Sequence, residues 1–75
     1  MAFEVWNLAT GNAIAEYATE ADALALIRRT AEEHGRQEVA AWALTEVDDR
    51  DEERRVAEGE ALVDRAFAMT ADRRP

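Results

Sequence analysis

Carboxylates are the most frequent side chains in this chain that could do chemistry. The chain has 17 Asp and Glu residues, nine Arg and one His, and it has no Ser, Cys or Lys. These missing residues exclude nucleophilic catalysis by Ser or Cys and a Schiff base on Lys. The lone His34 is expected in the last turn of a helix, where a positive charge is favourable. A carboxylate-only mechanism is the remaining catalytic alternative, but so small a domain has little room for a substrate cleft. We therefore expect no catalytic residue and no enzymatic activity.

One group of carboxylates has the spacing of a calcium-binding loop. Positions 1, 3, 5 and 12 of an EF-hand register are matched by Asp49, Asp51, Glu53 and Glu60. Position 6 of that register needs the sharp turn that Gly provides, and here it is Arg54. The three Gly residues are also too scattered to form a phosphate-binding loop or a dinucleotide fingerprint. We therefore expect no bound metal and no cofactor, and we interpret the segment as a solvated turn.

The net charge of −8 at pH 7 restricts the partners of this protein. An acidic surface repels phosphate backbones, so we expect no direct binding of nucleic acid. The same surface attracts basic proteins, which makes a basic protein partner one expectation. The abundance of Ala and Arg without Lys is typical of a GC-rich genome, and adaptation to high salt is the alternative interpretation.

The N-terminal segment MAFEVW has neither the basic region nor the apolar run of a signal peptide. No apolar run elsewhere is long enough to cross a membrane. The absence of Cys excludes disulfides and favours the cytosol. We therefore expect a cytoplasmic protein that does not enter membranes.

The start of the chain has the pattern of a β-hairpin. Apolar side chains alternate over residues 3–8, and an extended pattern resumes over residues 14–17. Between them, Thr10-Gly11-Asn12 supplies the residue types of a turn. Two short runs around such a turn predict a hairpin. A ligand-binding role for Thr10 or Asn12 is the alternative that the residues leave open.

A helix is predicted directly after this hairpin, over about residues 20–34. Thr19 is placed to cap it, with Asp22 at the third helical position as in a capping box. Gly35 follows the last periodic residue and is placed to end the helix.

The second half of the chain repeats the strand, strand and helix pattern. Residues 38–47 are apolar on both faces, which is typical of a strand covered on both sides. A charged loop over residues 48–54 and a short strand over residues 55–57 follow. A second helix is predicted over about residues 60–69.

These elements predict one α+β domain over residues 1–69 and a flexible tail over residues 70–75. Their order is ββαββα, and the halves share a faint likeness, IAEYATEADAL in the first and VAEGEAL in the second. Trp6 and Trp42 each open the first strand of a half. We expect two layers, a four-stranded antiparallel sheet with both helices on one face. The predicted core takes the largest apolar side chains, Trp6, Leu8, Leu24, Ile27, Trp42, Leu44, Leu62 and Phe67.

With the Trp side chains under the helices, the opposite face of the sheet is expected to be apolar, flat and exposed. Contiguous exposed patches of this kind mark interfaces. A second copy covering this face would also supply burial that so short a chain lacks. We therefore expect a homodimer, with these interface residues: Phe3, Val5, Ala13, Ala15, Tyr17, Val39, Ala41 and Ala43.

The hairpin VWNLATGNAIAEY, with its pattern W-x-L-x-T-x-N, runs directly into TEADAL. In this combination the chain resembles small uncharacterised bacterial proteins of GC-rich genomes, a likeness that implies no particular activity. A short hairpin before TEADAL also resembles, in topology, the HicB-type antitoxins, small acidic proteins that neutralise a basic toxin RNase. The sequence thus predicts a non-catalytic acidic interaction module that self-associates through a sheet face. An antitoxin-like protein that neutralises a small basic toxin is the alternative.

Overall fold

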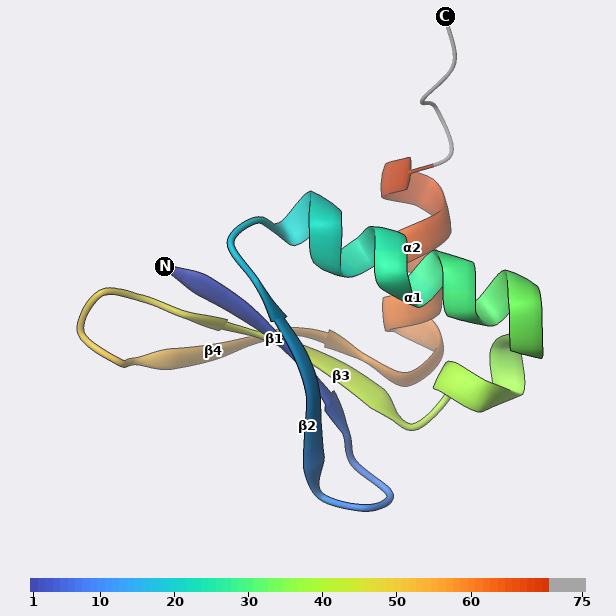
Figure 1. Cartoon of the computed structure of the whole chain (residues 1–75), viewed down its shortest axis with the longest axis horizontal. Helices are drawn as coiled ribbons and strands as arrows, with labels where there is room; N and C mark the ends of the chain where they lie inside the picture. The colour runs from blue at the N-terminus through green and yellow to red at the C-terminus, as the bar shows by residue number, and fades with distance from the viewer. Residues whose placement is uncertain (71–75) are drawn as a thin grey trace, which may run out of the picture.

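The protein consists of a four-stranded antiparallel sheet and two helices that pack on one of its faces (Figure 1). The structure is a computed structural model, and it describes residues 1–70. The strands lie in the order β2-β1-β3-β4. The predicted ββαββα order and α+β class are confirmed. The elements, with a short 3₁₀ helix η1, are β1 Ala2–Asn7, β2 Asn12–Tyr17, α1 Glu20–His34, η1 Arg36–Val39, β3 Trp42–Val47, β4 Glu53–Glu58 and α2 Gly59–Thr70.

Helix α1 has the ends that the sequence predicts. The Thr19 side chain accepts a hydrogen bond from the Asp22 backbone N–H at 3.2 Å, which satisfies one of the free donors of the first turn. At the other end Gly35 adopts φ 97°, and its N–H donates to the Ala31 carbonyl at 2.8 Å. A positive φ is easily reached only by Gly, so the helix ends at His34.

The third strand is shorter than predicted. Residues 36–39 form η1, and β3 begins at Trp42 rather than at residue 38. A continuous apolar run fits a strand and a buried helical turn equally well, so the pattern alone could not separate them. The Val39 side chain is fully buried in η1, which explains the apolar residue at this position.

The final elements are longer than predicted. Strand β4 covers six residues instead of the three expected over residues 55–57, and α2 follows it directly from Gly59. Helix α2 includes Thr70, the first residue of the predicted tail, whereas residues 71–75 of that tail lie outside the described residues.

The core lies between the helices and the face of the sheet that carries Phe3 and Val5. The prediction that Trp6 and Leu8 fill this core is wrong, because Trp6 is half-buried on the other face and Leu8 is 46% exposed. Alternation separates the two pairs of side chains but does not say which pair faces the helices. Five predicted core residues are confirmed as buried, Leu24, Ile27, Trp42, Leu44 and Leu62, and Phe67 packs against them half-buried.

The two halves are related by an approximate two-fold axis at the centre of the sheet. Val5 pairs with Leu44 across β1 and β3, and on either side Phe3 pairs with Glu46 and Asn7 with Trp42. A rotation about this axis that exchanges the two halves therefore reproduces the same strand pairing. In this exchange Phe3, and not Trp6, is the residue equivalent to Trp42.

Each edge strand also carries an irregularity at the same place beside this centre. The pairing shifts at Ile14 of β2, next to the pair of Val5 with Ala15, and at Val56 of β4, next to the pair of Leu44 with Ala57. Residues 14–16 and 56–58, IAE and VAE, are therefore structural equivalents. This equivalence is the one that the sequence likeness of the halves indicated.

The corrected core makes a prediction about two leucines. Leu44→Ala removes a fully buried side chain at the centre of the sheet and is expected to lower the free energy of unfolding by about 2–5 kcal/mol. Leu8→Ala removes the same atoms from an exposed position and, at a protein concentration at which the chain is monomeric, is expected to cost less than about 1 kcal/mol. Urea denaturation followed by circular dichroism measures both. Equal losses would contradict the assignment of the faces.

Candidate interaction surface

The loop between β1 and β2 is built as a hairpin turn. The Gly11 N–H donates to the Asn7 carbonyl at 2.8 Å with φ 76° at Gly11, and the Asn7 Oδ1 accepts from the Ala9 N–H at 2.9 Å. The Thr10 hydroxyl donates to the same Asn7 carbonyl at 3.4 Å, and Asn12 enters the ladder opposite Asn7. These contacts account for the turn residues without a ligand.

The apolar face predicted as an interface is mostly the face that the helices cover. Phe3, Val5 and Val39 belong to the buried core, so they are not available to a partner. Ala15 and Tyr17 pair with Val5 and Phe3, and therefore lie on the same helix-facing side. This part of the prediction is wrong because it followed from placing Trp6, instead of Val5, under the helices.

The outer face of the sheet carries the other members of the predicted set. Ala13 and Ala43 both pair with Trp6 on this face, but Ala43 is fully covered by its neighbours. Ala41 is half-buried just before β3 and its carbonyl accepts from the Leu8 N–H at 2.8 Å. Of the predicted interface residues, only Ala13 is therefore exposed on this outer face.

Most of the outer face is polar. Across the sheet, Glu16, Glu4, Thr45 and Arg55 stand opposite one another in a row. The Trp6 indole N–H donates to a Glu4 carboxylate oxygen at 2.9 Å, and Arg55 donates to the Thr45 hydroxyl at 3.1 Å. This row of polar side chains differs from the flat apolar surface that the sequence predicted.

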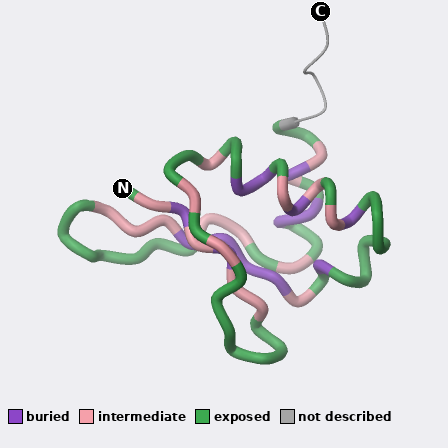
Figure 2. Tube along the Cα trace, in the orientation of Figure 1, coloured by how far each residue is buried: buried purple, intermediate pink, exposed green. Residues whose placement is uncertain are grey.

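Exposed apolar side chains gather instead on the β1–β2 hairpin. Leu8 is 46% exposed and Ile14 is 40% exposed, and Trp6, two residues before Leu8 on the same hairpin, is half-buried. We call Trp6, Leu8 and Ile14 the hairpin patch. Figure 2 shows that β2 and its turn are largely exposed, whereas buried residues concentrate in β1, β3 and the inner sides of the helices.

The two edge strands differ sharply in charge. Strand β4 carries four charged residues among six, and two of them are arginines that also pair with Glu46 and Glu58. Strand β2 carries only one charged residue, Glu16. Charged side chains on an edge strand oppose pairing with another strand. The β4 edge is protected in this way and the β2 edge is not.

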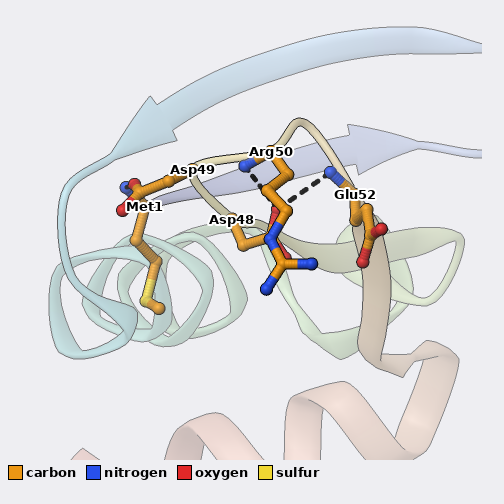
Figure 3. Close-up of polar contacts among 5 residues, drawn as sticks. All are labelled: Met1, Asp48, Asp49, Arg50 and Glu52. Atoms are coloured by element: carbon orange, nitrogen blue, oxygen red, sulfur yellow. Dashed lines mark hydrogen bonds and ion pairs between the residues drawn. The ribbon is translucent and has the colours of Figure 1, made fainter.

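The acidic loop at the opposite end of the sheet, residues 48–52, is also organised by its own contacts. One Asp48 carboxylate oxygen accepts the backbone N–H groups of Arg50 and Glu52, both at 2.9 Å, and Asp49 lies 3.0 Å from the Met1 amino group (Figure 3). An open hollow of about 510 Å³ lies beside it, lined by Met1, Glu46, Asp48, Glu52, Glu53 and Arg54.

The carboxylates of the EF-hand register do not lie together in one cluster. Asp49 pairs with Met1, whereas Glu60, which belongs to α2, pairs with Arg36. Within residues 1–70, no group of three or more His, Cys, Asp or Glu side chains is arranged to hold a metal ion.

A cluster that the sequence patterns did not reveal joins η1 to the helices. The Arg36 guanidinium donates to Asp64 at 2.6 Å and to Glu60 at 3.1 Å, and these hydrogen bonds raise the pKa of Arg36. The Phe67 ring lies 5.1 Å from the Arg28 guanidinium carbon and 5.6 Å from that of Arg36. These contacts hold η1 against α2, and the partners are too far apart in sequence for spacing to predict them.

Comparison with known proteins found no family, no curated protein and no solved structure that matches this chain. In the part of the chain that the structure describes, no helix is both long enough and apolar enough for a membrane span.

The turn makes a prediction about Gly11. No atom lies within 4 Å of a Cβ built at this position, so the positive φ alone decides the effect of a substitution. Gly11→Val is expected to lower the free energy of unfolding by about 1–2 kcal/mol, and Gly11→Asn by less, since Asn tolerates this region best among other residues. Thermal unfolding of the two variants tests this. An equal loss in both would contradict a role set by backbone conformation.

Proposed function

We propose that this protein is a non-catalytic interaction module of the cytoplasm that binds a second copy of itself through the β1–β2 hairpin. The observation that carries the proposal is the hairpin patch. Leu8 and Ile14 are large apolar side chains that remain exposed on one hairpin, beside the half-buried Trp6. A row of polar side chains, Glu16, Glu4 and Arg55 among them, crosses the same outer face.

Burial of this patch is favourable for a chain of this size. Each Å² of apolar surface removed from water contributes about 25 cal/mol, and a small domain has little such surface to bury within itself. The proposed contact also lies near few of the carboxylates that give the chain its charge of −8, because β1 contributes Glu4 and β2 contributes Glu16. Two like-charged copies would therefore meet at a weakly charged surface.

A basic protein partner is the second candidate, as the resemblance to antitoxins implies. The observation that favours it is the acidic hollow beside residues 48–52, which Glu46, Asp48, Glu52 and Glu53 line. The loop of residues 48–52, two of whose residues line this hollow, lies at the end of the sheet opposite to the β1–β2 turn (Figure 1). The two candidates thus use separate surfaces and can be tested separately.

Self-association predicts a solution mass of twice the 8.4 kDa of the chain, measured by light scattering at micromolar concentration. Leu8→Asp places a charge in the patch and is expected to return the protein to the mass of one chain. Met69→Asp is the matched control, because Met69 is another large apolar side chain that is 55% exposed but lies on α2. It is expected to leave the mass unchanged.

Salt dependence separates the two candidates. Added salt screens the repulsion between two acidic copies, so it is expected to strengthen the homodimer. The same salt would weaken a complex with a basic protein. A wild-type chain that is monomeric throughout the micromolar range would refute self-association, and a salt-sensitive complex with a basic protein would then support the second candidate.

A further inference from the structure

Strand β2 is an edge strand whose backbone has a neighbour on one side only. Five of its six residues pair with β1, all except Ile14, and no other strand of residues 1–70 lies beyond it. Unpaired N–H and C=O groups along such an edge can accept another strand. The question is which strand fits this edge.

The approximate two-fold axis supplies an internal comparison. Ile14 is equivalent to Val56, so Asn12 and Ala13 of β2 occupy the positions that Arg54 and Arg55 occupy in β4. Both edges carry an irregularity in pairing, and this feature therefore does not distinguish them. The charge of the two edges does distinguish them, because the arginines Arg54 and Arg55 of β4 correspond to the uncharged Asn12 and Ala13 of β2.

From this difference we infer that the β2 strands of two copies pair antiparallel, so that two four-stranded sheets join into one continuous sheet. This inference rests on the proposed self-association and names its geometry. A basic segment of another protein would meet only one carboxylate, Glu16, on this edge. A second β2 strand also carries only one charged residue, so its charge matches this edge better.

The charges that remain on β2 are compatible with self-pairing. A two-fold axis centred near Ile14 would place Glu16 level with the uncharged Asn12 of the partner subunit and not level with the second Glu16. The two Glu16 carboxylates would then be four residues apart along the strands, about 14 Å at 3.4 Å per residue. This separation exceeds the screening length of about 8 Å at physiological ionic strength.

Single cysteines test this geometry without interference, because the chain contains no Cys of its own. Cysteines are introduced one at a time as Ala13→Cys, Ile14→Cys and Ala15→Cys, a scan that covers a shift of one residue in register. Val56→Cys at the equivalent position of β4 is the matched control. Disulfide-linked dimers are quantified on non-reducing gels after mild oxidation.

At least one of the β2 cysteines is expected to cross-link on the order of 100-fold faster than the β4 cysteine. Pairing holds the two thiols at an effective concentration near the millimolar range, against a protein at micromolar concentration. Circular dichroism of each variant confirms that it is folded.

The outcomes separate this inference from the proposed function. A wild-type chain that is monomeric by light scattering refutes both. A wild-type dimer in which no β2 cysteine cross-links faster than Val56→Cys refutes the strand pairing alone. Preferential cross-linking at β2, in a dimer that Leu8→Asp dissociates, supports both.

Discussion

Val5 and Leu44 pair at the middle of the sheet, and both side chains are fully buried beneath the helices. This contact joins β1 to β3 and thereby joins the two ββα halves. Helix α1 then covers β2 and β1, and α2 covers β4 and β3. Because each helix packs mainly on the strands of its own half, the central pairing decides which sheet face is buried and which strands become edges.

The function that we propose is a consequence of how the two edges differ. The halves share one architecture, but β4 carries four charged residues and β2 carries one. The β4 arginines are engaged with Glu46, Thr45 and Glu58 within the same sheet. The first half instead exposes Leu8 and Ile14 on its hairpin. An edge that carries a single charged residue and is flanked by apolar side chains is suited to a strand of the same kind.

Local signals in the sequence predicted the order of elements, the ends of α1 and the hairpin turn, because Thr19, Gly11 and Gly35 act through their own backbone neighbours. The choice of the buried face was not predictable in this way. Phe3 and Val5 alternate with Trp6 and Leu8, and only the pairing with Leu44 in the other half decides between them. The predicted interface therefore contained core residues and left out Leu8 and Ile14, which the structure leaves exposed. The likeness of IAE and VAE aligns the two edge strands, and this alignment reveals their difference in charge.

Hydrogen exchange of the β2 backbone tests the central claim most directly, because it reports on the N–H groups that the partner strand would engage. We predict that the amides of β2 that point away from β1 exchange more slowly as protein concentration rises, while the outward amides of β4 do not change. Exchange in β2 that stays the same over a range of concentrations in which the mass rises from one chain to two would contradict the account.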